Sequence, residues 1–152
     1  INKYNIDEKR IIFLDYIYID QHLARHRIAD LYLDTFNYNG HTSAVDALYS
    51  GLPIVTKIGN SFSARVCASI LSAFDMSELI TKSDETYYKL ISKLINDKIF
   101  YRVILAKTKK NILESKLFKT KNYIKNLEKA FLKILGMKIK ENKTNNIYIE
   151  DK

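Results

Sequence analysis

The residues best suited to do chemistry lie between positions 34 and 46, where an apolar run gives way to Asn, Gly, His and hydroxyl side chains. Gly40 allows the backbone to approach a ligand closely. A helix is predicted to begin here, with His41, Thr42 and Ser43 as side-chain donors and Asp46 one turn further as an acceptor for ribose hydroxyls. A helix N-terminus that follows a parallel strand presents free N–H groups to a phosphate. The same pattern also fits an N-capped helix with an incidental histidine, so spacing alone leaves both alternatives open.

Two predicted strands and the helix between them position this segment. Residues 31–35 and 53–56 are short apolar runs of strand length. Residues 42–50 form the helix, with Thr42 as its N-cap and Gly51 after its last turn. Strand, helix and strand with short links predict parallel pairing through a right-handed crossover.

The rest of the chain continues this alternation and then becomes helical. Further strands are predicted at residues 10–15 and 77–81, and further helices at residues 20–29 and 61–74. C-terminal helices are predicted after Ser83, from about residue 100 to 113, and from near residue 120. The fold class is therefore α/β: residues 1–138 form a partial doubly wound domain with a parallel sheet and a C-terminal helical extension. Residues 139–152, rich in Lys, Asn and Glu, are predicted to be a disordered basic tail.

The composition is that of a globular chain. Of the 152 residues, 47% are hydrophobic and 28% charged. No apolar stretch is long enough to span a bilayer, and the start of the chain lacks a signal region. The first residue, Ile1, is not an initiator Met, which suggests a fragment. The single cysteine, Cys67, excludes an intrachain disulfide and favours a reducing cytoplasm; its place on an apolar helix side predicts a small buried hydrophobe.

The net charge of +8 raises the question of a nucleic-acid partner. Most Lys residues follow Lys89 and are spread around helical repeats and the tail, without the interleaved aromatic residues of a single-strand binding surface. A solvated basic surface is therefore the preferred interpretation, and nucleic acid is not expected as a partner.

Several spaced motifs in the same order resemble glycosyltransferase family 41, which includes the nucleocytoplasmic O-GlcNAc transferases and their bacterial relatives. The motifs are HLARHRIADLYLDT (22–35), NGHTS (39–43), DALYSGLPIVT (46–56), RVCAS (65–69) and SKLFKT (115–120). The similarity covers roughly residues 6 to 135. It implies a GT-B fold, of which this chain is part of the nucleotide-sugar-binding half, with the first strand and helix of that half lying upstream.

The resemblance also implies which residues contact the nucleoside. The residue that matches His22 stacks on or contacts the uridine, and the one that matches Arg25 lies near the uracil edge. Asp46 matches the carboxylate that binds the ribose. Without the resemblance, His22 would be interpreted as a histidine on a helix surface, and His26 has no matching role.

For the pyrophosphate, the resemblance implies binding at Gly40, His41, Thr42 and Ser43. The family has His-Thr-Thr at this helix start, and Ser43 keeps the hydroxyl of the second Thr. These residues, together with His22 and Asp46, are expected to line one cleft. The chain departs from the family where Ile19 replaces a frequent Lys and where Asn60 replaces a Glu.

The implied reaction is an inverting, metal-free transfer of GlcNAc from UDP-GlcNAc to Ser or Thr of acceptor proteins. The catalytic residues, the first catalytic half and the tetratricopeptide repeats that recruit acceptors are expected upstream of this chain. Two alternatives stay open: transfer of another sugar, such as glucose, to Asn, Ser or Thr, and a non-catalytic basic binding module.

Overall fold

A computed structural model describes residues 4–141 and 146–149, with the backbone alone for residues 138–141. A parallel sheet lies at its centre, with β1 (Tyr32–Leu33), β2 (Ile54–Lys57) and β3 (Ile80–Thr81) in the order β1-β2-β3. Tyr32 pairs with Ile54, and Thr56 pairs with Ile80. The predicted parallel pairing of the strands around residues 31–35 and 53–56 is confirmed.

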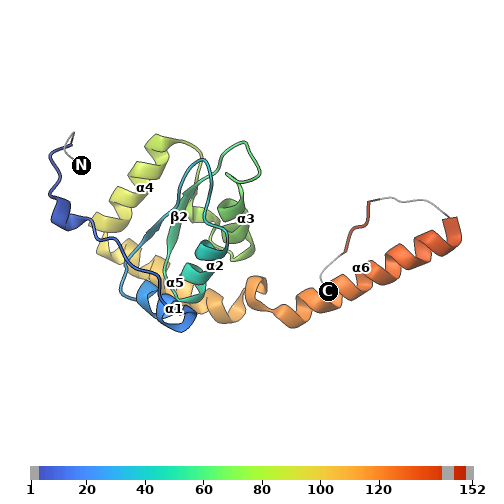
Figure 1. The fold of residues 1–152 in the computed structure, drawn as a ribbon. Coiled ribbons are helices and arrows are strands. Elements are labelled where there is room, and N and C mark those ends of the chain that lie inside the picture. Colours follow the sequence, from blue (N-terminus) through green and yellow to red (C-terminus); the bar gives the residue numbers. More distant parts are fainter. Residues whose placement is uncertain (1–3, 142–145, 150–152) are drawn as a thin grey trace.

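Helices cover both faces of this sheet. In Figure 1, α4 (Asp84–Asn96) lies on one side of β2, whereas α2 (Thr42–Tyr49) and α3 (Val66–Ala73) lie on the other. The helix α5 (Lys98–Glu114) packs on α4 and α2, and α1 (Ile19–His26) packs on α2. The fully buried side chains come from the sheet, the facing helices and the turns after α3, and include Leu48, Ile54, Val55, Leu71, Phe74, Met76 and Leu79. The prediction of a doubly wound α/β domain is therefore confirmed.

The strand predicted at residues 10–15 is wrong in this structure. The turn η2 (Glu8–Arg10) is followed by an extended segment that pairs with none of the described strands. Its apolar side chains face solvent, and Phe13 is 91% exposed. An apolar run becomes a strand only where a neighbouring strand satisfies its backbone, and the described part of the chain places none beside it.

The helix predicted at residues 61–74 is shorter than expected, since α3 begins at Val66. Residues 61–65 form turns instead. The buried side chains of α3 are Cys67, Ala68 and Leu71. The prediction that Cys67 is buried is confirmed.

The predicted helix ends are mostly found. Gly51 adopts φ of 86° after α2, the left-handed conformation that favours glycine at this position. Ser83 caps α4 in a reciprocal capping box with Thr86. The N-cap of α2, however, is His41 rather than Thr42, and its side chain makes no capping bond. Residues 77–81 divide into the 3-10 turn η3 (Ser77–Leu79) and β3.

After the turn η4 (Lys116–Phe118), the helix α6 (Thr120–Glu141) projects away from the body (Figure 1). Its apolar side chains Ile124, Phe131 and Ile134 are exposed. The predicted tail at 139–152 overlaps the end of α6, and residues 142–145 and 150–152 of it lie outside the described residues.

Candidate functional site

The predicted site lies where β1 ends and α2 begins. Residues 34–41 leave the carboxyl end of β1 and turn back into the first turn of α2. The first bond of that turn runs from the Val45 amide to the His41 carbonyl, at 3.2 Å. Helix geometry leaves the amides of Thr42, Ser43 and Ala44 without an acceptor one turn earlier. These amides carry the positive end of the helix dipole, which attracts an anion.

Gly40 is enclosed by the protein's own atoms. A Cβ at this position would lie 2.5 Å from Tyr32 Oη and 3.0 Å from Ser43 Oγ. The Gly40 amide donates to Asp34 Oδ1 at 2.7 Å in a buried hydrogen bond. A ligand would therefore meet the backbone beyond Gly40, at Thr42 and Ser43.

His41 lies between two aromatic side chains at the start of α2. Its ring stacks on Tyr38 with centroids 4.9 Å apart, and Phe62 meets it edge-on at 6.4 Å. His41 Nε2 is buried and has no hydrogen-bond partner among the described residues. A buried ring nitrogen without a partner costs free energy, so this atom is suited to receive a polar group from a ligand.

A second group of predicted residues meets between α1 and α2. His22 Nε2 lies 3.9 Å from Asp46 Oδ2, and both side chains are about one-quarter exposed. Arg25 Nη2 lies 2.8 Å from His22 Nδ1 and also binds the Asp15 carbonyl through Nη1. Because a guanidinium only donates, Nδ1 accepts and the ring proton sits on Nε2, facing Asp46. His26 bonds to the His22 carbonyl at 2.8 Å, a structural contact within α1.

The structure thus brings His22, Arg25 and Asp46 together, and Asp46 stands one turn into the helix that Thr42 and Ser43 begin. Ser43 Oγ is 3.1 Å from Tyr32 Oη. Of the two departures from the family pattern, Ile19 is an exposed residue at the start of α1, and Asn60 lies in an exposed bend after β2.

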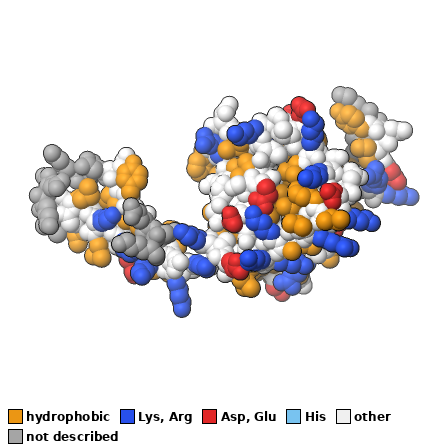
Figure 2. Space-filling model, turned by 180° about the vertical axis from the view of Figure 1, so that it is seen from behind, with side chains coloured by type: hydrophobic (Ala, Val, Ile, Leu, Met, Phe, Trp, Pro, Cys, Tyr) orange, Lys and Arg blue, Asp and Glu red, His pale blue; other side chains and the backbone are white. Residues whose placement is uncertain are grey.

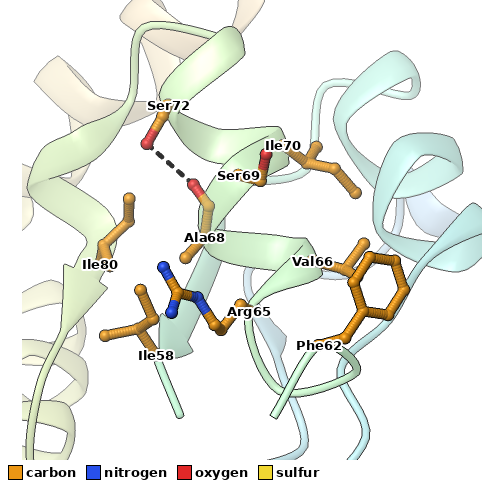
Figure 3. Close-up of a pocket in the computed structure, with 9 residues that line it drawn as sticks. All are labelled: Ile58, Phe62, Arg65, Val66, Ala68, Ser69, Ile70, Ser72 and Ile80. Carbon is orange, nitrogen blue, oxygen red and sulfur yellow. Dashed lines mark hydrogen bonds between the residues drawn. The ribbon is translucent and has the colours of Figure 1, made fainter. Parts of the chain in front are cut away.

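A pocket of about 590 Å³ lies beside this region, between α3 and the ends of β2 and β3. Figure 3 shows the Arg65 side chain pointing into it, toward Ile58 and Ala68. Phe62 lines the pocket and also touches the His41 ring, so the pocket adjoins the predicted site without containing any of its residues.

Burial favours the protonated form of the Cys67 thiol and the Tyr87 hydroxyl. Desolvation, with the Asp34 charge as a second cause, raises the pKa of the Cys67 thiol well above its usual range. The same two causes raise the pKa of Tyr87 to about 12. Cys67 is therefore a packed hydrophobe without thiolate character, as predicted. Among the described residues, no three His, Cys, Asp or Glu side chains are placed to hold a metal ion.

The main residue missed by sequence reasoning is Asp34. It lies within the strand predicted at residues 31–35, yet its buried carboxylate organises the loop that leads to α2. The available signal was an acidic residue directly after a buried apolar run, a position where a charge needs partners. Tyr32 contacts Ser43, and Tyr38 contacts His41. Nothing in the sequence indicates these contacts except that both tyrosines lie close to the motif in the chain.

On the face seen in Figure 2, Lys and Arg side chains are scattered, with Asp and Glu between them.

No described helix has the length and apolar character needed to cross a membrane.

Comparisons with known proteins give one consistent result. The model of "Glycosyl transferase family 41" matches residues 1–127. A UDP-N-acetylglucosamine–peptide N-acetylglucosaminyltransferase of Caenorhabditis elegans is 33% identical over 123 residues, covering 81% of this chain and 11% of that protein. A probable enzyme of the same name from Arabidopsis thaliana, SEC, is 30% identical over 133 residues, covering 87% of this chain and 14% of that protein.

Among solved structures, a mutant O-GlcNAc transferase of Thermobaculum terrenum superposes with a TM-score of 0.80 at 23% identity. The match covers 87% of this chain and 25% of that one, so the predicted partial GT-B fold is confirmed. This chain spans only a small part of the length of its relatives. From the family match over residues 1–127, the chain belongs to glycosyl transferase family 41.

Proposed function

We propose that this chain is the donor-binding part of a protein O-GlcNAc transferase, which moves GlcNAc from UDP-GlcNAc to Ser or Thr side chains of proteins. The observation that carries the proposal is the start of α2, where free amides, the Thr42 hydroxyl and the unpartnered His41 Nε2 occur together after a parallel strand. This arrangement suits a pyrophosphate, whose oxygens accept hydrogen bonds from all three kinds of donor.

The nucleoside end of the donor is assigned to the group between α1 and α2. Asp46 can accept bonds from two adjacent ribose hydroxyls, since the one ion-pair contact of its carboxylate among the described residues is the 3.9 Å approach of His22 Nε2. Arg25 holds His22 through Nδ1, which fixes the plane of the imidazole ring. A fixed ring provides a stacking surface for uracil without a further loss of side-chain entropy.

In the proposed reaction, no metal ion takes part. The helix dipole and the donors at His41, Thr42 and Ser43 stabilise the charge that develops on the departing UDP. The groups that activate the acceptor hydroxyl, the first catalytic half and the repeats that recruit acceptor proteins belong to other parts of a longer polypeptide. A cytoplasmic location is part of this proposal, supported by the single, buried cysteine.

UDP binding by the full-length protein tests the donor site. His41→Ala and Thr42→Ala should each raise the calorimetric Kd for UDP by about ten- to a hundred-fold, because each removes a charge-assisted bond of roughly 1.5–3 kcal/mol. The matched control is Thr120→Ala, since Thr120 is likewise the first residue of a helix but lies on the projecting α6. Unchanged binding in both site variants would exclude the phosphate role.

The sugar is tested separately, by transfer to a Ser/Thr peptide. Radiolabelled UDP-GlcNAc should be consumed in preference to UDP-glucose at equal concentration. Preference for UDP-glucose would keep the family and the site but replace GlcNAc in the proposal.

A further inference from the structure

Asp34 is a buried carboxylate at the point where β1 ends and the loop to α2 begins. Its side chain is only 4% exposed. Oδ1 accepts the Gly40 amide at 2.7 Å, and Oδ2 accepts the Thr56 hydroxyl at 2.6 Å. The two bonds tie the end of β1 both to the neighbouring strand and to the residue just before His41.

Two donors to this carboxylate, the Gly40 amide and the Thr56 hydroxyl, come from the protein itself. A buried charge is tolerated only when it is well hydrogen-bonded, so the two bonds hold the loop firmly in place. Because Asp34 occupies the Gly40 amide, the backbone donors left for a ligand come after Gly40, at the start of α2. Asp34 thus determines where the row of free amides begins.

Further contacts hold the same loop at both ends. Tyr87 Oη donates to the Asp34 carbonyl at 3.1 Å. Asn39 Nδ2 donates to the Thr35 carbonyl at 2.7 Å, and Asn39 Oδ1 accepts the Cys67 amide at 3.4 Å. The loop is therefore anchored to α4 and α3 as well as to the sheet, and Asp34 is the one charged group among these anchors.

We infer that Asp34 is a positioning residue for nucleotide binding, which sets the direction of the α2 N-terminus through the Gly40 amide before the ligand arrives. The inference rests on the proposed function, since it concerns the same donor site. A site held in place in this way loses less entropy when it binds, and a small misplacement of its donors weakens every contact at once.

The test compares Asp34→Ala with Asp34→Asn in the full-length protein. Removing the acceptor in Asp34→Ala should raise the Kd for UDP by roughly tenfold or more, the loss expected when a row of donors is misplaced. Asp34→Asn keeps an oxygen for Gly40 and can donate to the Thr56 hydroxyl, so binding should return to near the wild-type value. Where Asp34→Ala does not fold, Asp34→Ser takes its place, because its side chain is too short to reach Gly40.

The control separates positioning from general stability. Asn111 is also buried, and its Nδ2 donates to the Phe74 carbonyl at 2.8 Å, at the C-terminal end of α3 rather than in the loop that leads to α2. Asn111→Ala should lower the melting temperature while UDP binds as in the wild type. If Asp34→Ala lowers the melting temperature but leaves the Kd for UDP unchanged, Asp34 is merely structural and the inference is overturned.

Hydrogen exchange at the Gly40 amide, measured without nucleotide, tests the Asp34 contact directly. A failure of the inference can therefore be told apart from a failure of the proposed function. Exchange at Gly40 should speed up by about tenfold or more in Asp34→Ala, since its acceptor is lost. Unchanged exchange overturns the inference. A wild-type protein that does not bind UDP, but in which Gly40 exchange changes when Asp34 is replaced, contradicts the nucleotide role. It leaves intact the finding that Asp34 holds Gly40 and Thr56, which we call the Asp34 clamp.

Discussion

Replacing Gly40 by alanine should destabilise the protein mainly through its tightest contact, the one with Tyr32. The new Cβ would lie 2.5 Å from Tyr32 Oη, a separation that real Cβ atoms do not tolerate. Gly40 is not among the residues with positive φ, so the backbone conformation itself is open to alanine. The cost therefore comes from crowding against Tyr32, whose hydroxyl also bonds to Ser43 at 3.1 Å.

The magnitude follows from these two effects. Overpacking by one methyl group costs about 1–3 kcal/mol, and the lost Tyr32–Ser43 bond adds about 1 kcal/mol. Gly40→Ala should thus lower the free energy of unfolding by about 2–4 kcal/mol. Tyr32→Phe alone should cost about 1 kcal/mol, and because it removes the obstructing oxygen, Gly40→Ala in that background should cost less than about 1 kcal/mol.

A double-mutant cycle of urea unfolding measures this coupling. Four proteins are compared: wild type, Gly40→Ala, Tyr32→Phe and the double variant. If Gly40→Ala costs the same with and without the Tyr32 hydroxyl, the Tyr32 contact is not the reason for glycine at this position.

Three further outcomes are expected. Because burial raises the pKa of the Cys67 thiol, the unfolded chain loses this proton at a lower pH than the folded protein does. The free energy of unfolding should therefore fall as pH rises above about 9.0, the ordinary thiol value, and should fall less in Cys67→Ala. An equal dependence of the free energy of unfolding on pH in the two proteins would show that Cys67 is not responsible. Ser83→Ala removes the capping box of α4 and should cost about 1 kcal/mol in urea unfolding, whereas no loss would mean that the cap is replaced by water. The 152-residue chain alone should transfer no radiolabelled GlcNAc from UDP-GlcNAc to a peptide, and measurable transfer would show that the catalytic groups lie in this part.

The sequence was most informative where local signals and packing agree. The helix from Thr42, its end at Gly51 and the cap at Ser83 depend on backbone geometry and nearby bonds, which a short stretch of sequence encodes. Residues 10–15 failed because a strand also requires a partner, and no local pattern shows whether one is present. In α3, the apolar residues allowed more than one buried face, and contact with β2 selected the one that contains Cys67.

For the candidate site, the family motifs predicted the residues, and the structure adds their contacts. The contact between His22 and Asp46 depends on how α1 packs on α2. The two residues are 24 positions apart, and helical periodicity predicts contacts only within one helix. The Asp34 clamp was equally hidden, because its partners Gly40 and Thr56 come from a loop and a different strand.

The short strands have a consequence for the register of the sheet. Since β1 and β3 contain two residues each, few backbone bonds fix which residues face one another. The Thr56 hydroxyl binds the Asp34 carboxylate on one side, and Thr81 Oγ1 donates to the Thr56 carbonyl at 2.9 Å on the other. A slip of β2 by one residue would turn the Thr56 side chain to the opposite face and bring Val55 or Lys57 to the carboxylate. The alignment of the three strands is therefore encoded by hydroxyl groups along the edge where α2 begins, so a change at Thr56 would reach the donor site as a shift in strand alignment.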